Sequence, residues 1–293
     1  MSAPVLVTGA TGKQGGAAVE ALTAAGVPVR ALVRDPESGR AKSLGVELVV
    51  GDLHDRASLV AATKGAGAVF SVQMPAFTAD GFDFEGEVAQ ATNLIEAARE
   101  SGVPQFVQTT VDGAGQHTVD ELYPVRAASM NAKAAIQDHL RTAGFERWTL
   151  LKPGFFMENF LPSSAFLFPR GVEGGLVSLL KPTTRLALVA VRDIGTAVAA
   201  AVADPGRFHR VELELASDHL SMAEIAAVLS RVLGAGLTAP DMTLDEARAA
   251  GLPEMASGHD RLNETGMAGR PEYARELGLP LTGFAEWARE ALR

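Results

Sequence analysis

The sequence contains no cysteine, only two tryptophans and two tyrosines, and no apolar run of the ~18 residues that a membrane-spanning helix needs. The absence of cysteine excludes disulfides, thiolate nucleophiles and cysteine-ligated metals. The six histidines show no metal-binding spacing such as H-x-x-x-H, so we expect no metal site. No charged segment followed by an apolar one precedes the first strand-like run. We therefore expect no leader and no membrane association, and interpret the protein as cytoplasmic.

Positive charge is also scarce, because 26 Lys and Arg residues stand against 35 Asp and Glu residues, giving a formal net charge of −9. Proteins that bind nucleic acid through charge usually carry a basic face, so direct charge-driven binding of nucleic acid is not expected. A small anionic ligand is still compatible with this charge, since it needs only a local positive site. The length of 293 residues allows one large domain or two modest ones.

Short apolar runs alternate with helical patterns through the first half of the chain. The expected strands are Val5–Thr8, Val29–Val33, Glu47–Val50, Ala68–Val72, Gln105–Thr109 and Trp148–Lys152. The expected helices are Gly12–Ala25, a helix capped by Asp55 and running through Ala62, Phe84–Glu100 and Arg126–Ala143. Continuously apolar strands joined by helices are typical of parallel strands buried on both faces. The pattern predicts an α/β protein with a doubly wound (Rossmann) parallel sheet over residues 1–152.

The alternation breaks after Lys152, where residues 153–182 are rich in Gly, Pro and Phe. Further on we expect strands at Leu186–Val191 and His209–Leu215, a helix Ile194–Ala203 capped by Asp193, and a helix through Leu233 that begins with a Ser221/Glu224 capping box. We interpret residues 153–293 as a smaller α/β lobe that holds a substrate or partner. It is interleaved with the first domain, which segments near 186–215 complete.

A glycine-rich turn directly follows the first expected strand and opens the first helix. It consists of Gly9, Ala10, Thr11, Gly12, Lys13, Gln14 and Gly15. The first glycine permits the tight turn, the second lets backbone approach a pyrophosphate, and the third lets the helix pack closely. Unpaired N–H groups at a helix start favour an anion. A turn without a ligand is the alternative, but the strand and helix on either side favour a dinucleotide site.

Two further segments bear on the cofactor. Arg34, after the second strand, offers a planar guanidinium suited to a 2′-phosphate, which favours NADP over NAD, although the neighbouring Asp35 is the kind of residue that binds a 2′-hydroxyl. Asp52 and Leu53, after the third strand, are placed to flank the adenine. For Asp52, a role as a turn or cap acceptor is an equal alternative.

Lys133 is the most informative residue in the helix expected over Arg126–Ala143. It shares a face with Ile136 and Leu140 at helical spacing, and Ser129 lies one turn earlier on the same side. An ammonium group on an inward face is costly without partners, which suggests a role in the cofactor crevice. The alternative is a lysine that extends to the edge of the helix.

Several of these segments together carry a family resemblance. They are the run from Val7 to Gly16, Arg34-Asp35-Pro36, Gly51-Asp52, Lys133, the run Pro153-Gly154-Phe155-Phe156-Met157-Glu158-Asn159, and the C-terminal stretches Ala239–Pro253 and Phe284–Trp287. The chain resembles the NmrA-like family of atypical short-chain dehydrogenases/reductases over nearly its whole length.

The resemblance implies a set of NADP contacts. They would be made by Gly9 through Gln14, Arg34, Asp52 and Leu53, by Gln73, Met74 and Pro75 along the cofactor, by Lys133 on the nicotinamide ribose, and by Gly154, Phe155, Phe156 and Met157 over the nicotinamide. The family's redox sensor has a second basic residue at the 2′-phosphate where this chain has Ser38.

Catalysis departs from the usual pattern of the superfamily, in which Tyr-x-x-x-Lys moves a proton. Ser129 occupies the tyrosine position four residues before Lys133, and a serine hydroxyl is a poor acid at neutral pH. Thr109 and Thr110 end the fifth strand. Either these two threonines hydrogen-bond a substrate carbonyl or they simply cap the strand.

Two hypotheses follow. The first is an NAD(P)H-dependent oxidoreductase of a small carbonyl, quinone or enone substrate, with Lys133 and more weakly Thr110 as catalytic candidates. The second is a non-catalytic NADP(H) redox sensor that acts through protein partners, and a homodimer is compatible with either. The missing tyrosine favours the sensor, whereas Lys133 is compatible with both.

Overall fold

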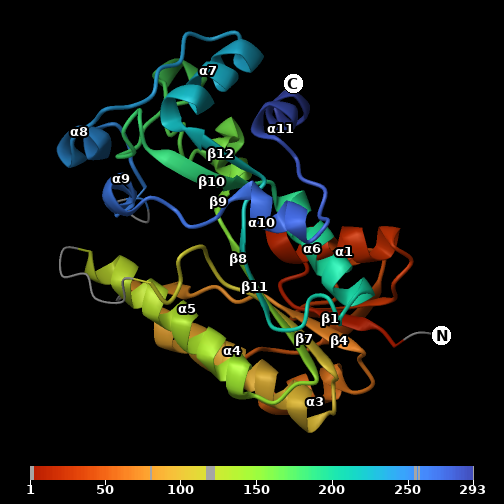
Figure 1. Ribbon diagram of the computed structural model, residues 1–293. Coiled ribbons are helices and arrows are strands. Elements are labelled where there is room, and N and C mark those ends of the chain that lie inside the picture. The colour runs from red at the N-terminus through yellow and green to blue at the C-terminus, as the bar shows by residue number, and fades with distance from the viewer. Residues whose placement is uncertain (1–2, 80, 117–122, 254–255, 257, 293) are drawn as a thin grey trace. The chain divides into compact units, whose positions relative to one another are not determined.

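The computed structural model describes residues 3–79, 81–116, 123–253, 256 and 258–292. It divides into two compact units (Figure 1). The first consists of Met1–Lys152 and Val191–Leu213, and the second of Pro153–Ala190 and Glu214–Arg293. Among the described residues, no helix is long and apolar enough to cross a bilayer.

The centre of the first unit is a seven-stranded sheet in the order β11-β8-β7-β4-β1-β2-β3. Its strands are β1 (Val5–Val7), β2 (Val29–Val33), β3 (Glu47–Val50), β4 (Ala68–Ser71), β7 (Gln105–Thr109), β8 (Arg147–Pro153) and β11 (Val211–Leu215). The five pairs from β3 across to β8 are parallel. Since β1 has β2 on one side and β4 on the other, the strand order reverses beside β1, where doubly wound sheets bind ligands.

Helices cover both faces of this sheet (Figure 1). On one face lie α1 (Lys13–Ala24) and α6 (Val191–Ala203), and on the other α3 (Arg56–Thr63), α4 (Phe84–Glu100) and α5 (Pro124–Thr142). A short helix, α2 (Gly39–Lys42), and a hairpin, β5 (Ala76–Thr78) with β6 (Gly81–Asp83), follow strands β2 and β4. This arrangement confirms the expected doubly wound fold.

Helices α1 and α6 pack closely because Gly195 of α6 has no side chain where the two helices meet. A Cβ added at Gly195 of α6 would lie 2.2 Å from the carbonyl oxygen of Ala17 in α1. Only glycine allows this approach. The other face has a conventional apolar core, in which Leu6 of β1, Leu94 of α4 and Phe106 of β7 are fully buried.

The second unit contains a three-stranded sheet in the order β12-β10-β9. Its strands are β9 (Phe155–Phe156), β10 (Arg185–Val189) and β12 (Asp218–Ser221). Its helices are α7 (Met222–Leu233), α8 (Leu244–Ala249), α9 (Leu262–Thr265), α10 (Pro271–Glu276) and α11 (Phe284–Ala291), and its 3₁₀ turns are η1 (Met157–Phe160), η2 (Pro162–Ser164), η3 (Val172–Gly174) and η5 (His259–Arg261). The expected Ser221/Glu224 capping box begins α7. The expectation of a smaller α/β lobe is confirmed.

Three expectations in the later half need correction. Asp193 is no N-cap, because α6 begins at Val191 and places Asp193 inside its first turn, where it is buried. The strand expected from His209 begins at Val211, since Arg210 has a φ of 61°, outside the extended region. Of the residues near 186–215 that were expected to complete the first domain, only Val191–Leu213 belong to the first unit. Strand β10 belongs to the second unit, because it pairs with β9 and β12 in that unit's sheet.

Candidate functional site

The glycine-rich turn joins β1 to α1 at the point where the strand order reverses. Gly9 has a φ of 58°, which favours glycine, and its carbonyl accepts a hydrogen bond from Gly12 N at 2.8 Å. Gly12 is the N-cap of α1 and provides no side chain to satisfy the first helical N–H groups. The first turn of α1 contains no acidic residue. Its positive end therefore lies beside the exposed Gly9, Thr11 and Gly12, as an anion site requires.

Gly15 has a different task from the one the sequence suggested. A Cβ there would lie 2.2 Å from the carbonyl oxygen of Gly9 and 2.7 Å from the nitrogen of Ala10. The glycine thus lets the first turn of α1 fold back on its own loop, whereas Gly195 brings α1 close to α6. Both positions exclude a side chain because the nearest atoms are backbone, which cannot move aside easily.

Arg34 follows β2 and is exposed. The carboxylate of Asp35 accepts a hydrogen bond from Glu37 N at 2.9 Å, so this acid serves its own turn. Ser38 is the N-cap of α2, and its hydroxyl donates to the Asp35 carbonyl at 2.9 Å. Ser38 therefore has a local structural role, and Arg34 is the basic group directly after β2.

Asp52 and Leu53 lie just after β3. Asp52 Oδ1 accepts from His54 N at 2.8 Å, which is the turn role considered as the alternative to binding. The Leu53 carbonyl accepts from the Asn93 side chain at 3.0 Å, and the Leu53 side chain packs on the core. Turn formation explains the position of Asp52 without a ligand, and adenine contact stays a prediction.

The residues after β4 divide into a buried part and an exposed part. Gln73 is buried, donates to Ser71 Oγ at 2.7 Å and accepts from Gln108 Nε2 at 2.9 Å. Met74 is 68% exposed, and Pro75 is half-buried before the β5–β6 hairpin. The Gln73 side chain is thus part of a buried amide network, while Met74 is accessible to a ligand.

Thr109 and Thr110 at the end of β7 use their hydroxyls differently. Thr109 Oγ1 donates to Gln14 Oε1 at 2.8 Å, whereas Thr110 Oγ1 accepts from Gln137 Nε2 at 2.9 Å. Arg141 donates to Gln137 Oε1 at 3.2 Å, which agrees with this orientation of the Gln137 amide. The bond to Gln137 does not use the hydroxyl hydrogen of Thr110, so that hydrogen is available to donate.

Lys133 lies on α5 one turn after Ser129 and shares its face with the buried Ile136. Its ammonium donates to Glu87 Oε1 on α4 and forms an ion pair with it. The Lys133 side chain is 14% exposed and that of Glu87 is 0% exposed. Burial raises the pKa of Glu87, against the opposing effect of the Lys133 charge. Lys133 is therefore directed inward, with a buried partner that its own helix does not supply.

The segment Gly154–Met157 belongs to the second unit, where its local packing is clear. A Cβ at Gly154 would lie 2.1 Å from the carbonyl oxygen of Ala187, so glycine is required there for a close approach to β10. Phe155 and Met157 are buried in that unit's apolar core, and Phe156 is half-buried. Their proposed place over the nicotinamide stays a prediction.

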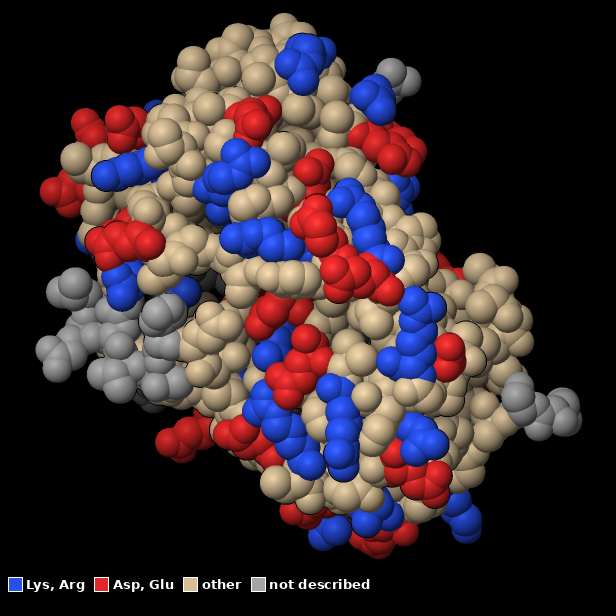
Figure 2. Space-filling model, in the orientation of Figure 1, with Lys and Arg blue, Asp and Glu red and all other residues tan. Residues whose placement is uncertain are grey.

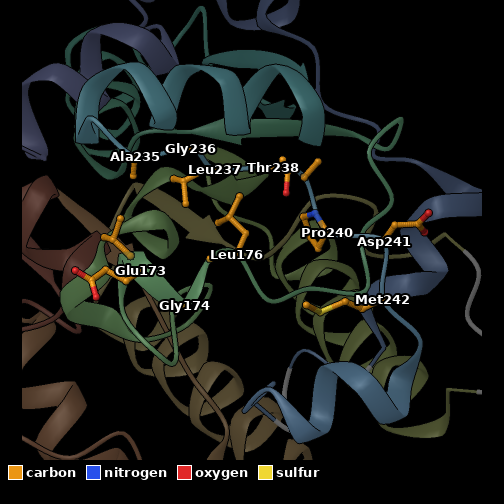
Figure 3. Close-up of a pocket in the computed structure, with 13 residues that line it drawn as sticks. Glu173, Gly174, Leu176, Ala235, Gly236, Leu237, Thr238, Pro240, Asp241 and Met242 are labelled. Carbon is orange, nitrogen blue, oxygen red and sulfur yellow. The ribbon is translucent and has the colours of Figure 1, made fainter.

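The second unit also contains a pocket of about 430 Å³ between residues 172–176 and 235–242. Figure 3 shows Leu176 and Leu237 between Glu173 at one end and Asp241 at the other. Both charged residues of its lining are acidic, so the pocket is poorly suited to a phosphate. On the face shown in Figure 2, acidic and basic side chains are interspersed.

Sequence reasoning did not identify Glu87 or Gln137 as parts of the site. Glu87 recurs with the buried Ala91 and Leu94 at helical spacing, so it lies on an inward face just as Lys133 does. That signal was present in the sequence, whereas the pairing of Gln137 with Thr110 depends on how α5 packs beside β7. Among the described residues, no group of three His, Asp or Glu side chains is placed to hold a metal.

The chain is similar to known proteins over nearly its whole length. An NAD(P)H azoreductase of Xenophilus azovorans is 30% identical over 97% of this chain and 96% of its own length. The structure of a Citrobacter sp. triphenylmethane reductase complexed with NADP(H) is similar with a TM-score of 0.80 at 22% identity, covering 98% of this chain and 99% of that one. The structure of NmrA, a negative transcriptional regulator, in complex with NADP gives a TM-score of 0.75 at 19% identity, over 99% and 95% of the two chains.

The model of the NmrA-like family matches residues 1–253, which include the glycine-rich turn, Arg34 and Lys133. The chain belongs to the NmrA-like family.

Proposed function

We propose that the protein binds NADPH at the turn between β1 and α1 and reduces a small conjugated substrate, such as a quinone, enone, carbonyl or azo compound. The observation that carries the proposal is the turn itself. Gly9 takes a left-handed conformation, Gly12 leaves the helix start without a side-chain cap, and Gly15 closes the turn where no Cβ would fit. This cradle of main-chain N–H groups fits a pyrophosphate.

The charged residues of the first unit support NADP over NAD. Arg34 is exposed after β2 and would hold the 2′-phosphate with its guanidinium fork. Asp35, the residue that would otherwise bind a ribose 2′-hydroxyl, accepts a hydrogen bond from its own turn. Lys133 would donate to the nicotinamide ribose. The similar structures of triphenylmethane reductase with NADP(H) and of NmrA with NADP support this assignment.

When bound, NADPH supplies a hydride. The chain must then position the substrate and provide a proton route without a tyrosine. Thr110 is the better placed of the two threonines, because its hydroxyl accepts from Gln137 and keeps its own hydrogen for a substrate oxygen or nitrogen. Thr109 instead donates its hydrogen to Gln14. Ser129 is too short and too weak an acid to replace the tyrosine.

The second candidate function is an NADP(H) sensor that acts through a protein partner. Ser129, which occupies the tyrosine position, favours it, as does the similarity to the transcriptional regulator. In this case cofactor binding would shift the population of two states that a partner distinguishes. Both functions require the same dinucleotide site.

Calorimetry with NADPH and NADH, followed by NADPH oxidation with a panel of quinones, enones, aldehydes and azo dyes, tests the proposal. We expect binding of NADPH and turnover of at least one class, with turnover lost in Lys133→Ala. Binding without turnover, joined to a cofactor-dependent change in oligomeric state or partner, would favour the sensor. Absence of binding at millimolar nucleotide would reject both.

A further inference from the structure

The ion pair between Glu87 and Lys133 is an unusual feature of the first unit. Glu87 lies in the first turn of α4, and Lys133 lies in the middle of α5, which packs against α4. The carboxylate of Glu87 is completely buried, and its Oε1 accepts a hydrogen bond from the Lys133 ammonium. Its other oxygen, Oε2, is buried without a hydrogen-bond partner among the described residues.

Stability alone gives little reason to retain such a group. A buried carboxylate with an unpaired oxygen loses its hydration, and well-packed apolar residues in place of a buried ion pair are often as stable. The apolar stripe of α4 continues from Glu87 through Ala91 and Leu94, so an apolar residue would fit the pattern. The charge at Glu87 therefore points to a role that an uncharged side chain would not perform.

Lys133 is the charged group that acts on Glu87. Among the described residues, the elements that pack most extensively on α4 are α3, α5, β4 and β5, and the two strands carry no charged residue. The charged residue of α3, Arg56, pairs with Glu96 and Glu100. On α5, Asp138 and Arg141 pair with each other, Arg126 lies two turns before Lys133, and His139 is on the final turn.

We propose that Glu87 is the positioning residue for Lys133, holding it as a directed ammonium that binds the nicotinamide ribose. The inference rests on the proposed function and extends it to a residue on a different helix. An ammonium has three donors, and Glu87 takes one. The others remain for ribose hydroxyls. In this chain Ser129 occupies the tyrosine position of the usual Tyr-x-x-x-Lys pattern. The Lys133 ammonium, fixed by Glu87, is therefore the part of that pattern that is retained.

Without Glu87, the largely buried Lys133 would lack its counter-charge, and burial would favour the neutral amine. Substitution of Glu87 should therefore weaken NADPH binding mostly at alkaline pH, where a neutral amine gains population. A residue that only fills space would weaken binding equally at every pH. The pH profile thus separates a positioning role from a structural one.

The experiment compares the wild type with Glu87→Gln and with Glu85→Gln, an exposed acid in the same helical turn. The dissociation constant of NADPH is measured by calorimetry from about pH 6 to about pH 9. We expect similar profiles for the wild type and Glu85→Gln. For Glu87→Gln, the ratio of its dissociation constant to that of the wild type should be about tenfold larger at the alkaline end than at the acidic end. Glu87→Asp, which keeps the charge, should restore much of the wild-type profile.

A second readout does not involve the cofactor. In protein labelled with ¹³C at the lysine ε-carbons, the Lys133 signal, assigned by its loss in Lys133→Arg, should titrate at lower pH in Glu87→Gln than in the wild type. Parallel NADPH profiles and equal Lys133 titrations would overturn the inference while leaving the proposed function intact. Absence of NADPH binding by the wild type would overturn the proposed function and the inference with it.

Discussion

Thr109 donates its hydroxyl hydrogen to the side-chain oxygen of Gln14 at 2.8 Å, and so links the end of β7 to the first turn of α1. The two residues are 95 positions apart in the sequence. The bond fixes the Gln14 amide within the glycine-rich turn. The proposed pyrophosphate cradle and the end of the strand that presents Thr110 are therefore parts of one hydrogen-bonded assembly.

Thr109→Val should weaken NADPH binding by about threefold to tenfold, because a lost hydrogen bond is worth about 0.5–1.5 kcal/mol and Gln14 would no longer be fixed. Calorimetric titration with NADPH measures this. Thr109→Ser keeps the hydroxyl and should bind within about twofold of the wild type. Equal affinities for the valine and serine variants would show that the link does not support the turn.

Arg34→Ala should weaken NADPH binding by about 10- to 100-fold and NADH binding little, because a charge-assisted hydrogen bond to the 2′-phosphate is worth about 1.5–3 kcal/mol. Dissociation constants for both nucleotides check this. Arg231→Ala, which removes an exposed arginine on α7 of the second unit, is the matched control and should change neither. Equal losses for both nucleotides in Arg34→Ala would remove the argument for NADP.

Gly195→Ala should destabilise the protein by about 1–3 kcal/mol, since the new Cβ would lie 2.2 Å from the Ala17 carbonyl oxygen and force α6 away from α1. The free energy of unfolding in urea measures the effect. Gly206→Ala adds the same methyl group where the nearest atom is 3.7 Å away, on the Asp204 side chain, and should be nearly neutral. Similar stabilities of the two variants would contradict the close helix contact.

The parallel sheet and its helices could be predicted because their signals are local. Continuous apolar runs mark the central strands, and Asp55 caps α3 as its position before the helical pattern suggested. The Ser221/Glu224 box likewise begins α7. The hairpin β5–β6 was not predicted, because β5 is exposed and β6 is half-buried along its whole length, so neither strand has a buried face that imposes a period on the sequence.

The candidate site was only partly accessible to the same reasoning. Glycine spacing and the strand–turn–helix context marked the turn, and helical periodicity marked Lys133. Glu87 escaped notice although it follows the same rule, because an acid in the first turn of a helix is usually a surface residue that complements the helix dipole. The bond between Thr110 and Gln137 depends on helix placement, for which one sequence offers no direct signal.

The last prediction concerns Glu212, which receives hydrogen bonds from Arg141 at 2.7 Å and an ion pair from Lys152 at 2.9 Å. The bond from Arg141, more than the charge of Lys152, lowers the pKa of Glu212 from 4.5 to about 2. A lowered folded-state pKa adds stability above pH 4.5 that is lost as the pH falls toward 2.

The free energy of unfolding should therefore fall less steeply between about pH 5 and pH 3 in Glu212→Gln than in the wild type, because the variant has no carboxylate to protonate there. Urea titrations at both pH values measure the slope. Glu146→Gln, which removes an exposed acid just before β8, should keep the wild-type slope. Parallel slopes for all three proteins would mean that the Arg141 and Lys152 contacts add nothing to folding, since protonation of Glu212 would then cost the folded state no more than the unfolded chain.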